Sequence, residues 1–129
     1  MPELTDEARR LLGGAHRAHL ATLLPDGSPH SVPLWIGLEG DLISFQTSPN
    51  SRKARNVARD PRVAVSVIDR DDPHRTALVR GRVVEQVDGD RGWAMIDRMS
   101  QAYLGMPYPE RADRVAYLIE PEHVRTVAF

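Results

Sequence analysis

The 129-residue sequence contains no cysteine, which excludes disulfide scaffolds, cysteine-based zinc sites, iron–sulfur clusters and thiolate catalysis. It also has no apolar run approaching the roughly 18 residues of a membrane-spanning helix. The first ten residues are polar and acidic and lack the apolar segment of a secretory signal. We therefore expect a cytoplasmic protein without a membrane partner, and one domain over residues 1–129, since this length is typical of a single domain.

Charge is nearly balanced, and lysine is almost absent. The chain has 17 basic and 18 acidic residues, a formal net charge of −1 at pH 7, and only 5% aromatic residues. This composition is not that of a nucleic-acid binder, and we expect no nucleic-acid partner. Lys53 is the only lysine, and all other basic residues are arginine. Ten prolines and nine glycines divide the chain into short segments, which disfavours a helical bundle.

Three segments are predicted to be helical. Thr5–Leu12 begins with an N-capping threonine followed by two acidic residues, which suit the first turn of a helix. Ser51 starts a second helix that runs to about Arg59, where Asp60-Pro61 stops it. The longest helix runs from Asp88 to about Leu104, with apolar residues at helical spacing.

Apolar and β-branched segments between turn signals predict strands. Pro33 argues for an edge strand or a bulge, because proline cannot donate to a sheet ladder, and Gly81 suggests a bulge or a close backbone approach. The predicted strands are Ala18–Leu24, Pro29–Leu38, Leu42–Thr47, Arg62–Asp69, His74–Val87 and Val115–Ile119, with Val124–Phe129 as a further candidate.

These strands follow one another in meander runs instead of alternating with helices. That order favours an antiparallel barrel or sheet with peripheral helices over a doubly wound fold. Ala18–Leu24 and Val63–Ile68 are apolar on both faces. One face would fill a barrel, so the other face has to be covered by helices or by a second subunit.

Residues 46–62 concentrate positive charge. Five basic residues and one acid give this segment a local balance of +4. Ser51, Arg52 and Lys53 lie at the predicted start of a helix, where free backbone N–H groups and the helix dipole favour an anion. The segment therefore predicts a phosphate site, although spacing alone fits a solvated basic helix face equally well.

Other chemistries find little support in the sequence. The five histidines show no metal-ligand spacing, so we expect no metal site. Neither a G-x-S-x-G motif, a Walker sequence nor a dinucleotide fingerprint is present. His30 and Tyr108 are candidate proton donors by residue type only. A solvent-facing position is favoured for His30, and we assign no catalytic residue.

The basic segment resembles a known family. Residues 47–54 read T-S-P-N-S-R-K-A, and residues 60–63 read D-P-R-V. Together they resemble the S-R-K…N-P-R-V segment of pyridoxamine 5′-phosphate oxidase. The similarity continues through residues 21–30 and 75–83 and covers about residues 5–125.

One branch of this family is more similar still. Residues 96–98, 103–105 and 107–109 read I-D-R, Y-L-G and P-Y-P. They resemble the actinobacterial flavin/deazaflavin oxidoreductases, which use the deazaflavin coenzyme F-420.

The resemblance implies an antiparallel, mainly β, split β-barrel with peripheral helices, like FMN-binding proteins, that forms a homodimer with two cofactor sites at its interface. Arg52 and Lys53 match the pair that grips the phosphate of flavin mononucleotide (FMN). Further implied contacts lie on the strand beside the cofactor ring, at a strand end and on a segment that reaches across the interface: Ser31, Val32, Pro33, Leu34 and Trp35; Gln46, Thr47 and Ser48; His74, Arg75 and Thr76.

Departures from the oxidase argue against pyridoxamine phosphate as substrate. Gly37 stands where the oxidase has a lysine for the substrate phosphate, and the oxidase's C-terminal extension has no counterpart after Phe129. We expect an oxidoreductase that transfers a hydride from reduced coenzyme F-420 to a small electron-poor organic substrate. An FMN-dependent oxidoreductase on the same fold and a non-catalytic flavin- or deazaflavin-binding protein stay open. Trp35 either packs in the core, which is favoured, or walls the site.

Overall fold

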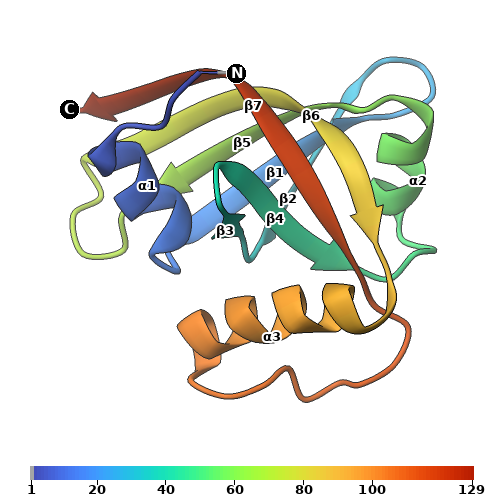
Figure 1. The fold of residues 1–129 in the computed structure, drawn as a ribbon. Coiled ribbons are helices and arrows are strands. Elements are labelled where there is room, and N and C mark those ends of the chain that lie inside the picture. Colours follow the sequence, from blue (N-terminus) through green and yellow to red (C-terminus); the bar gives the residue numbers. More distant parts are fainter. Residues whose placement is uncertain (1) are drawn as a thin grey trace.

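A computed structural model describes residues 2–129 of the protein (Figure 1). Its helices are α1 (Asp6–Gly13), α2 (Arg52–Arg59) and α3 (Gly89–Leu104). Its strands are β1 (Arg17–Leu23), β2 (Pro29–Leu34), β3 (Gly37–Glu39), β4 (Leu42–Thr47), β5 (Arg62–Ile68), β6 (Arg75–Val87) and β7 (Val115–Ala128). The mainly β, antiparallel architecture predicted from the meander order is confirmed.

The strands form one antiparallel sheet in the order β2-β1-β5-β6-β7-β4-β3. The sheet curls, so that side chains of strands far apart in this order meet in one apolar core. Leu20 of β1, Phe45 of β4 and Val67 of β5 belong to the same buried cluster. No pairing joins the edge strands β2 and β3 within residues 2–129, so the barrel stays open between them.

The helices close this barrel at different places (Figure 1). Leu11 and Leu12 bury the apolar side of α1 in the core, and Val57 does the same for α2. The buried Asn56 amide donates to the Thr22 hydroxyl at 2.9 Å and ties α2 to β1. α3 packs against β7 through a second apolar cluster. Within the described residues, no helix is long and apolar enough to cross a membrane.

One predicted strand is wrong in its extent. Pro29–Leu38 divides into β2 and β3, which pair with different neighbours, β1 and β4. At the break, the N–H of the buried Ile36 donates to the Tyr103 hydroxyl at 3.3 Å instead of to a neighbouring strand. β2 is an edge strand, as Pro33 predicted.

The two segments predicted at the C-terminal side form a single strand, β7. Its partner β6 shifts register at Gly81, which lies opposite Pro121, so a residue without a backbone donor fits there. A Cβ on Gly81 would lie only 2.2 Å from the carbonyl oxygen of Glu120. Both features predicted for Gly81, the bulge and the close backbone approach, are confirmed.

The outer face of the central strands remains open in one chain. A hollow of about 380 Å³ on this face is lined only by residues of β1, β2, β5, β6 and β7, and the chain's own helices do not line it. Leu78 on this face is 43% exposed. The face is less apolar than Ala18–Leu24 and Val63–Ile68 predicted, because His19, Ser66 and Arg80 lie beside its apolar residues.

Candidate functional site

A cavity of about 220 Å³ opens beside the first turn of α2. Five predicted site residues meet here, although they come from three separate segments of the sequence. The cavity is lined by Leu34, Trp35, Gln46, Thr47 and Lys53, together with Tyr108 and Arg114.

Hydroxyl groups fix the start of α2 against the end of β4. Ser51 is the N-cap, and its hydroxyl accepts the N–H of Ala54 at 3.2 Å. The Thr47 hydroxyl donates to the same Ser51 oxygen at 2.9 Å. The first turn of α2 holds no acidic residue, so the positive end of the helix is not neutralised locally. This end of the helix is thus an electropositive wall.

Lys53 and Arg114 make the cavity cationic. Lys53 is half-buried, and its pKa is lowered by burial and by the nearby Arg114 guanidinium. Among residues 2–129, no carboxylate lies within ion-pair distance of Lys53. Arg114 has one acidic partner, Glu110 at 3.0 Å, whose side chain is 65% exposed. An anion bound between the two cations would relieve their mutual repulsion.

Two buried polar atoms of the cavity residues lack hydrogen-bond partners. Gln46 Oε1 and Arg114 Nε are both buried and have no hydrogen bond within the described chain. A buried polar atom without a partner costs roughly 1–3 kcal/mol. A bound group with both donors and acceptors would satisfy this pair, so a ribityl phosphate fits the residues of the cavity.

Trp35 forms a wall of the cavity and belongs to neither buried core cluster, so the favoured prediction of core packing is wrong. Its ring stacks on Tyr103 at 4.9 Å and meets the edge of Tyr108 at 6.0 Å. The chain turns away from the sheet at this point, which leaves Trp35 half-buried between the last turn of α3 and the loop after it.

Other predicted contacts lie close by but do not line the cavity. Arg52 is exposed, and its guanidinium has no partner within residues 2–129. Ser48 donates to the Asp113 carboxylate at 3.0 Å. On β2, Ser31 faces the open side of the sheet, and Val32 is half-buried. Pro33 lines a second, neighbouring cavity.

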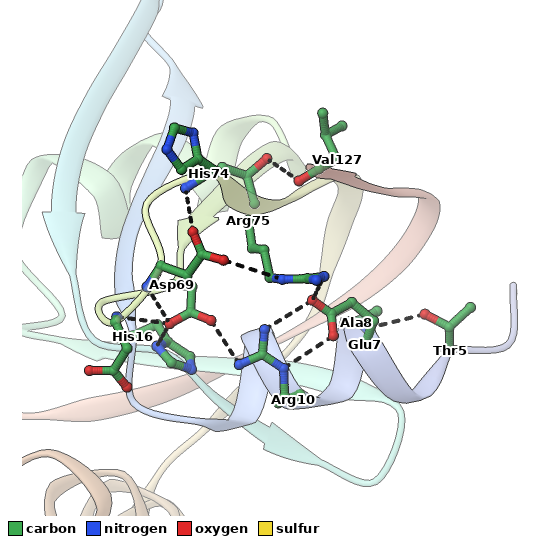
Figure 2. A network of polar contacts seen from close by, with 12 residues as sticks. Thr5, Glu7, Ala8, Arg10, His16, Asp69, His74, Arg75 and Val127 are labelled. Atoms are coloured by element: carbon green, nitrogen blue, oxygen red, sulfur yellow. Dashed lines mark hydrogen bonds and ion pairs between the residues drawn. The ribbon is translucent and has the colours of Figure 1, made fainter. Parts of the chain in front are cut away.

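The segment His74–Thr76 lies at the start of β6, which contacts α1 and not the α2 cavity. His74 and Arg75 belong to the polar network of Figure 2. Arg75 pairs with Glu7 and Asp72, each at 3.4 Å. The Thr76 hydroxyl donates to the Val127 carbonyl at 3.5 Å. One chain does not bring these three residues to the α2 cavity, so their contact with a cofactor across an interface stays a prediction.

A solvent-facing position was favoured for His30, but its side chain is only partly exposed. Its Nδ1 atom is buried and has no partner in the described chain. It does not line the α2 cavity. No group of three or more metal-binding side chains is found within residues 2–129.

Arg114 was missed by the sequence analysis, and Tyr108, a candidate proton donor by residue type, lines the cavity within the same chain. Arg114 reaches the site because β4 pairs with β7, which sets Thr47 opposite Val115. Asp97 holds the intervening loop: it pairs with Arg111 at 2.6 Å and accepts the Tyr108 N–H at 3.0 Å. These bonds, that to Arg111 above all, lower the pKa of Asp97. Because β4 and β7 lie far apart in the sequence, no pattern of neighbouring residues indicates that Arg114 reaches this cavity.

Comparisons with known proteins agree with this fold. The sequence pattern that defines the pyridoxamine 5′-phosphate oxidase family matches residues 4–128. A solved structure named F420 reductase is 34% identical, covers 97% of this chain and 98% of its own, and superposes with a TM-score of 0.79. No curated protein sequence matches the chain.

Two mycobacterial structures are also similar. The conserved hypothetical protein Rv2991 of Mycobacterium tuberculosis is 25% identical, with a TM-score of 0.81 and coverage of 98% of this chain and 86% of its own. A heme-binding protein of Mycobacterium smegmatis is 25% identical, with a TM-score of 0.77, over 98% of this chain and 55% of its own. Proteins similar to this chain thus include both a reductase and a heme-binding protein.

Proposed function

We propose that this chain, which belongs to the pyridoxamine 5′-phosphate oxidase family, is an oxidoreductase. Its α2 cavity binds the phosphate end of a flavin or deazaflavin cofactor. One observation carries this proposal. Lys53 and Arg114 face one cavity at the start of a helix, beside two buried polar atoms that lack partners. The cations and backbone N–H groups bind the phosphate, and Trp35 orients the ring and excludes water from it.

Coenzyme F-420 is the cofactor we favour, because the F420 reductase is 34% identical over nearly the whole chain. When bound in reduced form, it would supply a hydride (that is, two electrons with one proton) to an electron-poor organic substrate. The second proton that completes the reduction would come from solvent. FMN has the same ribityl phosphate and is the alternative. A binding protein without turnover is the third reading, supported by the heme-binding protein of the same fold.

The proposal includes a homodimer in the cytoplasm. The open sheet face, with Leu78 43% exposed beside polar residues such as His19 and Arg80, offers a surface to a second copy. In such a dimer, His74, Arg75 and Thr76 of one protomer would reach the cofactor of its partner. Sedimentation should give a mass near twice 14.4 kDa at micromolar concentration, and Leu78→Arg should lower it toward that of one chain. A monomer that binds cofactor with full affinity would contradict the shared site.

Titration of FMN and of F-420 into the protein, followed by absorbance, tests the binding proposal. Lys53→Gln should weaken binding about tenfold or more, because it removes a charge-assisted hydrogen bond worth roughly 1.5–3 kcal/mol. Arg55→Gln is the matched control: it makes the same charge change on α2 at an exposed residue outside the cavity. Equal affinities for wild type and Lys53→Gln would contradict the assigned site. Tighter binding of FMN would replace F-420 as the cofactor.

A further inference from the structure

A second cavity, of about 540 Å³, adjoins the α2 cavity. The two share Leu34 and Trp35 as wall residues, so molecules bound in them would lie next to each other. Its volume is within the range of small-molecule sites, roughly 300–1,000 Å³. The other residues that line it are Ala15, His16, Arg17, Ala18, His19, Pro33, Arg70 and Tyr103.

Two arginines of this cavity differ from most arginines of the chain. Nine arginines pair with a carboxylate within 4 Å. The side chains of Arg17 and Arg70 have no hydrogen-bond or ion-pair partner within residues 2–129, although both line the same cavity. Burial raises the pKa of Tyr103 and the Arg70 charge opposes this rise, in keeping with a guanidinium near the phenol.

The acids of the turn around Arg70 do not pair with its guanidinium. The contacts of Asp69 can be followed in Figure 2. Asp69 is only 4% exposed, pairs with Arg10 at 2.8 Å and accepts the backbone N–H of Asp71 at 2.9 Å. Asp72 pairs with Arg75 at 3.4 Å. The Asp71 carboxylate is exposed and lies beyond ion-pair distance from Arg70. The turn therefore directs its acids away from the cavity and leaves a cation at its edge.

The backbone that carries Arg70 is itself fixed. The N–H of Arg70 donates to Nδ1 of the buried His16 at 3.1 Å. His16 in turn is tied to α3, because its carbonyl oxygen accepts the Tyr103 hydroxyl at 2.7 Å. The backbone from which the exposed Arg70 side chain extends is thus fixed beside the aromatic wall before any ligand binds.

That wall is aromatic and has few free polar groups. Trp35 and Tyr103 stack with ring centroids 4.9 Å apart and planes 9° from parallel. The Tyr103 hydroxyl is used fully, since it donates to the His16 carbonyl and accepts the Ile36 N–H. Pro33 and Leu34 extend this apolar surface. A planar apolar group would pack here, and a polar one would lose hydrogen bonds to water.

We propose that this cavity binds a planar, conjugated carboxylate, with its ring system against the Trp35–Tyr103 wall and its carboxylate at Arg17 and Arg70. That this ligand is the hydride acceptor rests on the proposed function, because the cavity adjoins the proposed cofactor site. The binding preference itself does not depend on the proposed function, because it follows from the two unpaired guanidinium groups and the aromatic wall alone.

Isothermal titration with 2-naphthoate and its neutral analogue 2-naphthamide tests this preference. Wild-type protein should bind 2-naphthoate about tenfold more tightly, because only the carboxylate forms charge-assisted hydrogen bonds. Arg17→Gln and Arg70→Gln should each weaken binding of 2-naphthoate several-fold and leave that of 2-naphthamide unchanged. Unchanged binding of the amide also shows that each variant keeps its folded cavity. Arg55→Gln, an equal charge change on exposed α2, should alter neither.

Equal affinities for the two probes, absence of binding, or an equal loss in Arg55→Gln would overturn the proposal. Cofactor titration of the same proteins separates it from the proposed function. If F-420 or FMN binds and 2-naphthoate does not, the carboxylate site is wrong and the cofactor site stands. If 2-naphthoate binds as expected and neither cofactor does, the proposed function fails and the carboxylate site stands.

Discussion

The α1 and α2 ends of the sheet are both rich in arginine, but their charges are arranged differently. Near α1, Arg10 pairs with Glu7 at 2.9 Å and with Asp69 at 2.8 Å, and Arg75 completes the network through a second bond to Glu7 (Figure 2). Near α2, Lys53 has no acidic partner in the described chain. Arg10 thus holds the fold together, whereas Lys53 is available to a ligand.

The comparison shows that a count of basic residues does not identify an anion site. The α2 segment attracted attention because its local charge is +4, yet Arg62 in it is paired with Asp60 at 2.8 Å. Arg59 contacts the Leu23 carbonyl and so helps to hold α2 against β1. What distinguishes Lys53 is that it combines partial burial with the lack of a partner. Arg17 and Arg70 in the neighbouring cavity share only the lack of a partner, because both are exposed.

The largest effect is expected from charge reversal at the α2 end. Lys53→Glu should weaken binding of F-420 or FMN about 100-fold or more, because it removes one favourable contact with the phosphate and adds a repulsive one. Folding should survive, since Lys53 has no partner to lose. Absorbance titration measures the affinity and a thermal melt the stability. Arg55→Glu should change the affinity little, and an equal loss there would point to a diffuse charge effect.

The opposite result is expected at the α1 end. Asp69→Asn should lower the melting temperature by several degrees, because the nearly buried carboxylate binds both Arg10 and the turn that follows it. Cofactor affinity should stay the same. Asp71→Asn is the control, since that carboxylate is exposed in the same turn. If Asp69→Asn weakened cofactor binding with no loss of stability, the division between the two ends would be wrong.

Acid should act on the α1 network in a defined pH range. Hydrogen bonds from Asp71, Arg10 and Asp72 hold the pKa of Asp69 at about 2, against an ordinary value of 3.8. The folded protein therefore favours the ionised form, and the stability it contributes is complete above about pH 4 and is lost as the pH falls toward 2. Thermal melts from pH 5 to pH 2 should fall less steeply for Asp69→Asn than for wild type. Parallel curves would show that Asp69 does not contribute.

The smallest effect is spectroscopic. Cofactor binding should quench tryptophan fluorescence, and Trp35→Phe should remove most of that quench while changing stability little, because Trp35 walls the cavity. Trp93→Phe should keep the quench: this second tryptophan packs against the α3 cluster and lies under the Arg111 guanidinium at 4.3 Å. A quench that survives in Trp35→Phe would mean that another residue walls the ring site.

Local features of the fold could be predicted from the sequence. β4 has the predicted bounds, Thr5 caps α1 as predicted, and α2 ends at Arg59 as predicted, because caps, helix stops and strand alternation depend on neighbouring residues. The bulge at Gly81 could be predicted for the same reason, because a glycine inside a strand pattern is itself a local signal. The family resemblance inferred from residues 47–63 is confirmed by the match over residues 4–128.

Features that depend on distant residues could not be predicted. The chain breaks after Leu34 because Tyr103, far along the sequence, accepts the Ile36 N–H. Arg114 enters the α2 cavity only through the pairing of β4 with β7. The unpaired state of Lys53 is likewise invisible in a sequence, because it depends on which acids fold toward it.

A crystal structure of the protein in complex with F-420 tests most directly the central claim that the cofactor phosphate binds at the start of α2. The account predicts the cofactor phosphate at the first turn of α2, with Lys53 Nζ and the Arg114 guanidinium within about 3 Å of its oxygens. The ring system should lie against Trp35. A phosphate bound at the α1 end, or at Arg17 and Arg70, would contradict the assignment of the two cavities.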